Sequence, residues 1–514
     1  MGNGGRDSRG WGSASAIRRR HSALLFQCAY PASQIEWDTA NRELRELAVG
    51  VSARPAAHLH NSGIAGSTVV AAFSLATTRW LVDRFPDAVT LDSLGGDPIQ
   101  MMTILGPALD PLEQEVLAEH PLGWAAWQRR HLGTRRAGRL CALLSLVERI
   151  PGGSPHQEAA FASLRVFVRW RIPADAPIPT TGRLEGGALF LHRRALRRRT
   201  NLARAWREGP ARRIPLTTTG RHHLCDLARG TLASLLGETD PFTHPALDQL
   251  EQHDLGEGVQ VVLDPCTSQH KLALEAYVGY LLFKNRVPVA YGGGWVLGRQ
   301  ARFGINVLPP FRGGESARLL AQLLRLYAHR FGLSLFLVEP YQIGRGNADG
   351  IRSGAFWFYW RLGFRPRQRE LLQLARSEAR RVRAGGHRST AATLRKLSHA
   401  VLAWRTPLQA PCEPVDVEAV GCRVSRFILE HHRGDRRAAT RSAQRNLGIR
   451  DPRLATLLAA VAPPAGWPAR YLARLDRVML GKDSDELAQA IRLGRVGWLM
   501  DALARASTTE AAGT

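Results

Sequence analysis

A glycine-rich turn that runs into a helix is the segment of this sequence with the most direct chemical meaning. Residues 307–317 read Val-Leu-Pro-Pro-Phe-Arg-Gly-Gly-Glu-Ser-Ala, and a leucine-rich helical stripe follows as far as Gly332. The first amides of a helix lack intrahelical partners, and the helix dipole adds partial positive charge there. Gly313 and Gly314 carry no side chain that would keep a ligand away. The turn therefore predicts a pyrophosphate-binding site.

A second segment has motif-like spacing. Residues 355–364 read Ala-Phe-Trp-Phe-Tyr-Trp-Arg-Leu-Gly-Phe. Ala355 and Tyr359 are four residues apart and share a helix face, and Gly363 suits the end of that helix. Taken alone, Tyr359 is better explained as a member of an aromatic core with its neighbours in this segment. An apolar strand over Leu333 to Glu339 separates the two segments.

Together the two segments resemble the GNAT acetyltransferase superfamily. The family pattern at the turn is V-x-P-x-x-[RQ]-G-x-G-x-[GA], and the second family pattern is A-x-x-x-Y-x-x-x-G-F. The matching residues are Val307, Pro309, Arg312, Gly313 and Ala317 in the first and Ala355, Tyr359, Gly363 and Phe364 in the second. The chain departs from the family at Glu315, where a second glycine is usual, and at Arg352, where Asn is usual.

The resemblance implies a fold class, a cosubstrate and a general acid. The fold is α/β, a GNAT-like mixed sheet with helices (the acyl-CoA N-acyltransferase fold), flanked by mostly helical regions. The cosubstrate is acetyl-CoA or another acyl-CoA, without a metal, and Tyr359 protonates the departing thiolate. The residues expected to bind the cosubstrate are Val307, Leu308, Pro309, Arg312, Gly313, Gly314, Glu315, Ser316, Ala317 and Arg352.

Position alone suggests the remaining site residues. A carboxylate can take the proton of an attacking amine, and Glu339 ends a strand beside the expected acyl group. Its alternative role is a surface carboxylate paired with Arg345 or Arg352. Glu315 is a second candidate base. The polar loop that follows Glu339 predicts acceptor contacts from Tyr341, Gln342 and Arg345.

Composition and the pattern of apolar residues divide the rest of the chain into regions. We expect a flexible basic arm at 1–35, a helical region at 36–160, a mixed region at 161–254, the GNAT-like domain at 255–370, a helical basic region at 371–506 and a disordered tail at 507–514. The mixed region includes a strand over 163–172 and a basic helical stretch around Arg193–Arg199. Because 365–383 is helical in pattern, the last GNAT strand is missing, displaced or supplied from elsewhere, such as 163–172. Glycines 292–294 inside an expected strand indicate a bulge or the close approach of a backbone or ligand.

Composition leaves two explanations of the charge open. The net charge is +26, carried almost wholly by arginine. Arginine in place of lysine is typical of a GC-rich, bacterial-type genome, whereas a basic surface also suits a polyanion. Six cysteines form no CxxC pair, which favours reduced thiols and a cytoplasmic location. No apolar run is long enough for a transmembrane helix.

The sequence therefore predicts an enzyme, an acyl-CoA-dependent N-acyltransferase that acetylates an unknown amine in a ternary complex. The alternative is a catalytically silent GNAT-like module that binds CoA or acts as a scaffold, with basic helical regions that bind nucleic acid or another polyanion. The sequence does not identify the acceptor, the acyl chain length or the oligomeric state.

Overall fold

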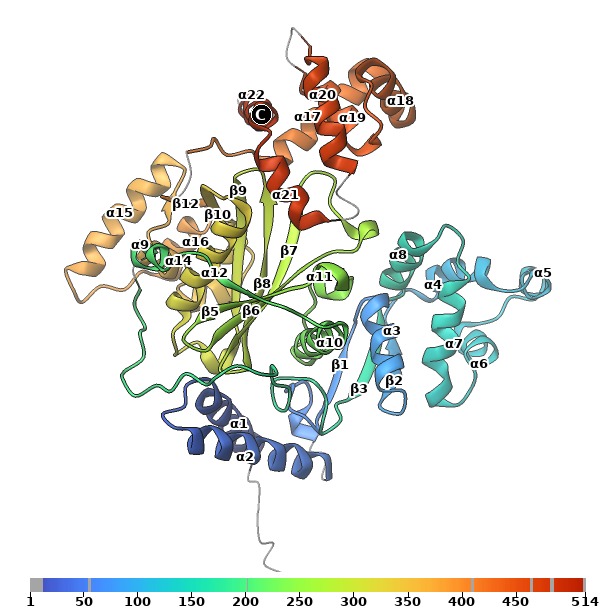
Figure 1. The fold of residues 1–514 in the computed structure, drawn as a ribbon. Coiled ribbons are helices and arrows are strands. Elements are labelled where there is room, and N and C mark those ends of the chain that lie inside the picture. The colour runs from blue at the N-terminus through green and yellow to red at the C-terminus, as the bar shows by residue number, and fades with distance from the viewer. Residues whose placement is uncertain are drawn as a thin grey trace, which may run out of the picture. The chain divides into compact units, whose positions relative to one another are not determined.

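The computed structural model describes residues 13–53, 57–200, 202–407, 411–462, 466–480 and 485–511. They belong to two compact units, which are treated separately below (Figure 1). The first unit contains residues 1–194, 217–244 and 283–288. The second contains residues 195–216, 245–282 and 289–514.

The first unit is mainly helical and holds one small sheet. Its strands, in the spatial order β1-β3-β2, are antiparallel. The core between this sheet and its helices contains Trp80, Trp127 and Trp170. The strands are β1 (Thr68–Ala71), β2 (Val89–Leu94) and β3 (Val166–Arg171). The helices are α1 (Ala14–Ala29), α2 (Gln34–Ala53), α3 (Leu75–Arg84), α4 (Pro98–Leu105), α5 (Pro111–Glu119), α6 (Trp124–His131), α7 (Arg136–Glu148), α8 (Ser154–Leu164), α10 (Thr218–Ser234) and α11 (Asp240–Thr243).

Two expectations for this unit are corrected. Residues 14–29 form α1 instead of a flexible arm, because Ser13 caps the helix and Ile17, Leu24 and Leu25 bury one face. Residues 1–12 lie outside the described residues. The strand expected at 163–172 is present as β3, but it pairs with β1 and β2 and does not belong to the sheet of the second unit. The helical pattern of residues 36–160 did not predict β1 and β2.

The second unit is built on a mixed sheet with the strand order β11-β12-β10-β9-β8-β7-β6-β5-β4. The strands are β4 (Arg212–Ile214), β5 (Glu251–Gly256), β6 (Val259–Pro265), β7 (Ala276–Lys284), β8 (Val287–Leu297), β9 (Gln300–Val307), β10 (Leu335–Val338), β11 (Arg365–Pro366) and β12 (Leu402–Arg405). The tip of the β7–β8 hairpin is grouped with the first unit. The sheet occupies the green-to-yellow centre of Figure 1.

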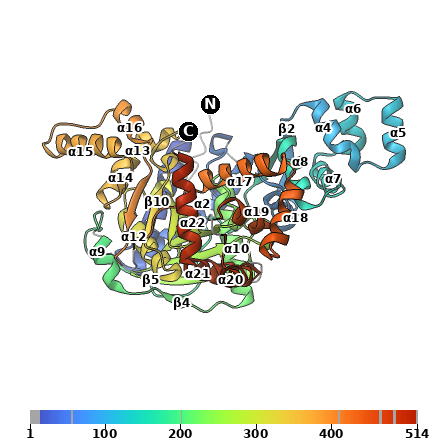
Figure 2. The same ribbon diagram turned by 90° about the horizontal axis from the view of Figure 1, so that it is seen from above.

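Helices of the second unit surround this sheet. They are α9 (Leu202–Ala205), α12 (Ser316–Phe331), α13 (Ala348–Ser353), α14 (Ala355–Arg361), α15 (Arg369–Arg383), α16 (Ala391–Leu397), α17 (Val417–His432), α18 (Arg436–Leu447), α19 (Pro452–Ala460), α20 (Ala469–Leu480), α21 (Glu486–Gly494) and α22 (Gly497–Ala511). Helices α17 to α22, orange to red, form one group in Figure 2 with a leucine-rich core. The expected tail at 507–514 is thus helical to Ala511, and residues 512–514 lie outside the described residues.

Aromatic packing on α12 explains the glycines of β8. Tyr327 of α12 contacts Phe303 edge to face at 4.9 Å between ring centroids and donates a hydrogen bond to the Val278 carbonyl at 2.8 Å. A Cβ atom on Gly294 would lie 2.7 Å from the Tyr327 ring. One on Gly293 would lie 2.4 Å from the ring of Tyr277. A Cβ atom on Gly292 would lie 2.6 Å from the backbone carbonyl oxygen of Gly304, so the expected close approach of a backbone is confirmed at this glycine. Tyrosine rings occupy the space beside Gly293 and Gly294.

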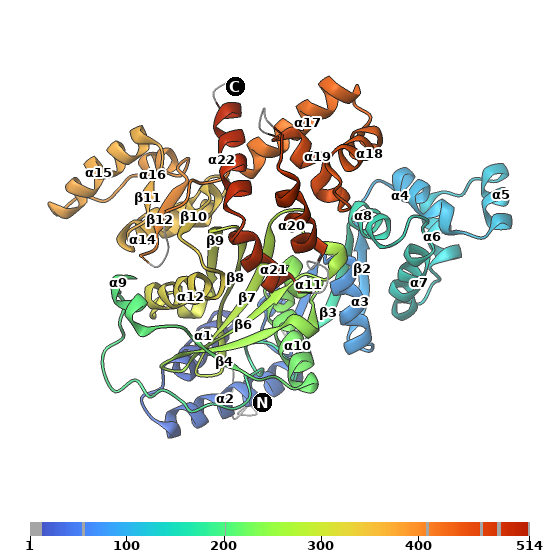
Figure 3. The ribbon, with the colours of Figure 1, turned by 45° about the horizontal axis from the view of Figure 1, so that its top comes forward.

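The closing strand of the sheet comes from a region with a helical pattern. After α14 the chain forms only the two-residue strand β11, and α15 follows as expected. The chain then returns as β12, which lies between β10 and β11 and is antiparallel to both. Figure 3 shows α15 and α16 beside these strands. Residues 402–405 therefore supply the strand next to β10 at this end of the sheet, and residues 163–172 do not.

The basic stretch at 193–199 is not helical. Its backbone hydrogen bonds join residues that are two apart, as from the Arg198 N–H to the Leu196 carbonyl at 3.0 Å, whereas those of an α-helix join residues that are four apart. Residues 195–200, which belong to the second unit, are called the strap below.

Candidate functional site: an arginine-lined cavity at the β9–α12 turn

The glycine-rich turn joins the end of β9 to the start of α12. A short 3-10 helix, Pro309–Phe311, follows the strand and buries Phe311 in the core. The space where a Cβ of Gly313 would point is open, so packing does not require this glycine. Among the described residues, no backbone acceptor lies within hydrogen-bond distance of the Gly313 or Ser316 amide. The turn therefore presents bare amides at a helix N-terminus, the arrangement that binds phosphate.

A cavity of about 1290 Å³ lies against this turn. Its lining contains Gly313, Gly314, Ser316 and Ala317 of the turn together with parts of the strap, α13, α14 and α15. The Ser316 hydroxyl is buried and has no hydrogen-bond partner among the described residues. No Asp or Glu is among the described lining residues, whereas eight arginines are: Arg198, Arg199, Arg312, Arg352, Arg361, Arg365, Arg383 and Arg388.

Two of these arginines share one carboxylate outside the lining. Asp349 accepts from Arg352 at 2.8 Å and from Arg312 at 3.4 Å. The hydrogen bond from Arg352, and then the charge of Arg312, hold the pKa of Asp349 below its ordinary value. Arg312 also donates to the carbonyl of Val307. Asp349 thus orients two guanidinium groups at the edge of the turn.

Glu315 faces away from the cavity. Its side chain is 2% exposed, and Oε1 accepts a hydrogen bond from the backbone N–H of Arg197 at 2.9 Å. Arg197 itself pairs with Glu257 at 3.1 Å. The carboxylate that departs from the family pattern therefore fastens the strap, and the next two residues, Arg198 and Arg199, line the cavity. As a base, Glu315 would have to leave this contact.

Strands β9 and β10 diverge beside the turn. They pair in parallel only from Gln300 to Arg302 of β9, whereas β9 continues to Val307 with β8 as its only partner. The side chain of Gln342 fills the space beside Gly304, where a Cβ atom would lie 2.6 Å from Nε2. Gln342, predicted to contact an acceptor, is therefore at the divergence of the two strands.

Tyr359 lies at the same divergence. It is 2% exposed, makes a backbone hydrogen bond with Ile305 of β9, and contacts Phe364 edge to face at 5.5 Å. Burial raises the pKa of its hydroxyl, an effect that the hydrogen bond from Ile305 opposes. Tyr359 is not among the cavity-lining residues. Tyr359 is thus a member of the aromatic core, and its hydroxyl contacts the backbone of β9.

Glu339 stands at the end of β10 and is half-buried. Burial raises the pKa of its carboxyl, Arg302 opposes the rise, and Asp416 and Glu275 add to it. Within the described residues no arginine or lysine lies within ion-pair distance of Glu339. Arg352 pairs with Asp349 instead, and Arg345 is exposed. The alternative role as a carboxylate paired with either arginine is therefore not observed.

The other predicted residues spread around the turn. Tyr341 is 61% exposed, and Val307, Leu308 and Pro309 lie on the strand side of the turn, outside the cavity lining. Of the ten residues expected to bind the cosubstrate, the cavity brings together Arg312, Gly313, Gly314, Ser316, Ala317 and Arg352. The sequence did not reveal the contributions of the strap, α15 and residues 387–389. The arginine density of 193–199 and 369–383 was the only signal, and it does not specify a shared cavity.

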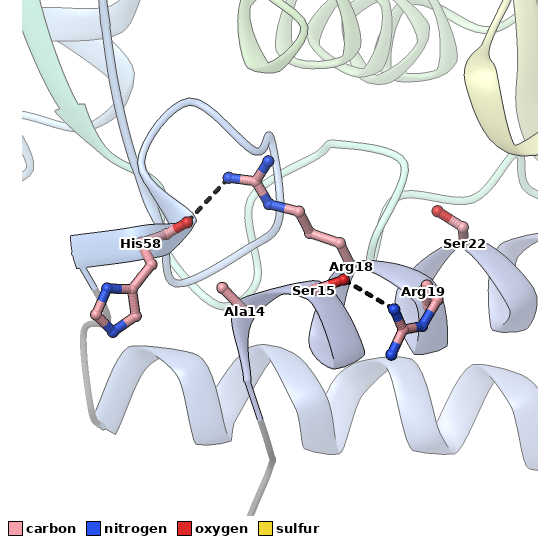
Figure 4. Close-up of a pocket in the computed structure, with 6 residues that line it drawn as sticks. All are labelled: Ala14, Ser15, Arg18, Arg19, Ser22 and His58. Atoms are coloured by element: carbon pink, nitrogen blue, oxygen red, sulfur yellow. Dashed lines mark hydrogen bonds between the residues drawn. The ribbon is translucent and has the colours of Figure 1, made fainter.

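A hollow in the first unit contrasts with this site. It has a volume of about 600 Å³ and lies at the start of α1 (Figure 4). Arg18 there donates to the carbonyl of His58 at 2.9 Å, and Arg19 donates to Ser15 at 2.8 Å. Its arginines thus already bind neighbouring oxygens, and it has no glycine-rich turn.

Comparison with known proteins gives no match. No protein-family model matches the chain, and neither the curated proteins nor the solved structures include a significant relative. Across the described part of the chain, every helix is too short or too polar to cross a membrane.

Proposed function

We propose that this chain is an acyl-CoA-dependent N-acyltransferase with a GNAT-like fold, acetyl being the simplest acyl group. The observation that carries the proposal is the β9–α12 turn. Gly313, Gly314 and Ser316 of this turn line a cavity that contains eight arginines and no described carboxylate. The Gly313 and Ser316 amides have no backbone hydrogen-bond partner among the described residues. A pyrophosphate is the ligand that such a helix N-terminus suits best, since amides and guanidinium groups both donate to phosphate oxygens.

The connectivity of the sheet supports the GNAT-like fold. The order strand, turn, helix, strand, loop, helix is present as β9, α12, β10 and α14 with the intervening turn and loop. The family ends with a further strand after Gly-Phe, and β12 provides a strand at that edge.

The divergence of β9 and β10 suits direct transfer. In the proposed step the amine nitrogen bonds to the thioester carbonyl carbon, and the carbon–sulfur bond then breaks. Tyr359 donates its proton to the departing thiolate, and Glu339 or a water accepts the proton that the amine loses. A pKa above the ordinary carboxyl value makes Glu339 a better proton acceptor than an exposed carboxylate. Gln342, beside Gly304, is the nearest predicted acceptor contact.

A second candidate function is a silent module that binds CoA without turnover. It is favoured by one observation, that neither Tyr359 nor Glu339 is among the cavity-lining residues. In that case the cavity binds the cosubstrate but the hydroxyl of Tyr359 stays on Ile305 as a core contact.

Release of free thiol separates the two functions. The purified chain is incubated with acetyl-CoA and a panel of amines that includes polyamines, amino sugars and peptide N-termini. Amine-dependent thiol release that Tyr359→Phe lowers about 100-fold supports the enzyme, since general-acid catalysis contributes roughly 10²–10⁴-fold. The silent module is supported if the parent chain binds acetyl-CoA but, with every amine, releases thiol no faster than the Tyr359→Phe variant does.

A further inference from the structure

The arginine-lined cavity extends beyond the turn of the proposed cosubstrate site. Binding pockets for small ligands are typically about 300–1,000 Å³, and this one is about 1290 Å³. The turn, Arg312 and Arg352 form one part of the lining. The other part comes from the end of α14, from α15 and from the segment that follows it, and contains Arg361, Arg365, Arg383 and Arg388.

Among the described residues, no carboxylate lies within ion-pair distance of the second group of arginines. The like charges of Arg376 and Arg383, after burial, lower the pKa of the Arg365 guanidinium. Glu378 of α15 is 3% exposed and is already bound by Arg381 at 3.2 Å and His387 at 2.7 Å. Crowded like charges destabilise a folded chain unless a counter-charge binds among them. The cluster therefore favours an anion larger than one phosphate.

Aromatic rings lie between the arginines. Trp357 and Phe358 of α14 are half-buried and line the cavity, and Trp357 Nε1 donates to Ser389 at 2.9 Å. Arg365 stacks over the ring of Trp360 at 4.0 Å. Guanidinium groups that follow a phosphate backbone, with aromatic faces on which bases stack, are the combination that binds single-stranded nucleic acid. A duplex hides its base faces and could use only the charge.

The positive charge continues from the cavity onto the surface of α15. Arg376, Arg380 and Arg383 are exposed on this helix, and α15 projects beside α16 and β11 in Figure 3. An extended anionic chain, unlike a compact ligand, could contact both the cavity and this surface.

We propose that the α14–α15 part of the cavity and the exposed arginines of α15 bind single-stranded nucleic acid. Phosphates pair with Arg376, Arg383 and Arg388, and a base stacks on Trp357 or Phe358. This binding goes beyond the proposed acyl transfer and does not depend on it, because the turn and Arg312 are not part of it.

Fluorescence anisotropy with labelled 12-mers of oligouridylate and oligothymidylate, and with a 12-base-pair DNA duplex, tests the proposal. The variant is Arg376→Gln/Arg383→Gln/Arg388→Gln. The matched control is Arg437→Gln/Arg441→Gln/Arg445→Gln on α18, where three exposed arginines have no carboxylate within ion-pair distance among the described residues. Both variants lose the same charge, and thermal melts verify that both fold.

The expected result is single-strand binding that weakens at least tenfold in the α15 variant and less than threefold in the α18 control. The slope of log K against log salt falls by about 2 in the α15 variant, because three phosphate contacts are lost at about 0.7 each. The uridylate and thymidylate oligomers show whether RNA or DNA binds more tightly, and either one supports the site. Equal losses in both variants, tighter binding of the duplex, or no binding at 50 mM salt would each overturn it. Acetyl-CoA affinity is measured in the same variants, so failure of the cosubstrate site is recognised separately.

Discussion

The Glu315 carboxylate accepts a hydrogen bond at 2.9 Å from the backbone N–H of Arg197, 118 residues earlier in the chain. This contact gives a structural use to the residue that replaces a family glycine. It also places Arg198 and Arg199 of the strap in the wall of the cavity. A carboxylate beside a phosphate-binding turn would repel the ligand, but here it is directed to the strap.

Replacing Glu315 tests this role. Glu315→Ala leaves the Arg197 amide without its charged acceptor, and a hydrogen bond to a charged group contributes about 1.5–3 kcal/mol. We expect the strap to detach and acetyl-CoA to bind roughly tenfold more weakly by titration calorimetry. Arg197→Ala, which keeps the backbone N–H, serves as the control and should change affinity less. Tighter binding by Glu315→Ala would instead show that the carboxylate repels the ligand.

Asp349 competes with the ligand for Arg312 and Arg352. Asp349→Asn removes the charge but not the size of the side chain, so both guanidinium groups become available to phosphate. Acetyl-CoA should bind about threefold more tightly, and the gain should shrink as salt is raised, because all three side chains are exposed. Weaker binding would mean that Asp349 is needed to hold the arginines in place.

The raised pKa of Glu339 gives a pH dependence with a definite sign. As the base it must be ionised, so the acylation rate should rise with pH through a value above the ordinary carboxyl pKa. Glu339→Gln should lower the rate at neutral pH and abolish this rise. An unchanged rate-versus-pH curve in Glu339→Gln would exclude Glu339 from the role.

The same shift affects stability. A folded-state pKa above the unfolded value means that the ionised carboxyl disfavours the folded state, with the loss complete above the raised value. The melting temperature of Glu339→Gln minus that of the parent should therefore be more positive at pH 7 than at pH 4. A variant that is equally destabilised at both pH values would contradict the assignment.

Glu251 should produce the opposite behaviour. Burial alone would raise its pKa, but hydrogen bonds from His253 and Arg330 outweigh burial and lower the pKa to about 2. This depressed value contributes stability that is present above pH 4.5 and is lost as pH falls toward 2. The difference between the ordinary and the lowered pKa corresponds to roughly 3 kcal/mol of folding free energy. Denaturant unfolding should therefore show that Glu251→Gln destabilises the chain at pH 7 but little at pH 2. Equal destabilisation at both pH values would show a packing effect only.

The turn and the strands around it were predictable because their signals are local. The amides of the turn belong to consecutive residues, and glycine ends α12 at Gly332, whose φ is +68°. Strand β12 was not predictable in the same way. Residues 402–405 read Leu-Ala-Trp-Arg, too short for an alternating pattern, and the edge between β10 and β11 determines their conformation.

The residues that line the cavity could not be predicted from the sequence for a similar reason. Arg198 and Arg199 follow the residue whose amide Glu315 binds, whereas Arg383 lies in the last turn of α15 and Arg388 in the segment after it. A charged stretch in a sequence is compatible with a solvated surface or with a binding wall, and only contacts with distant residues distinguish them. The backbone N–H of Arg197 donates to the Glu315 carboxylate and is therefore not available for a helical hydrogen bond within the arginine run.

If the β9–α12 turn is a cosubstrate site, acetyl-CoA binds to the purified chain, and titration calorimetry measures that binding. Arg312→Ala removes a cavity-lining guanidinium at the turn, and Arg441→Ala removes an exposed one on α18 as the control. We expect micromolar binding that weakens at least tenfold in Arg312→Ala, the effect of one charged hydrogen bond, and is unchanged in Arg441→Ala. No detectable heat with the parent chain, or equal affinities for the parent and Arg312→Ala, would contradict it.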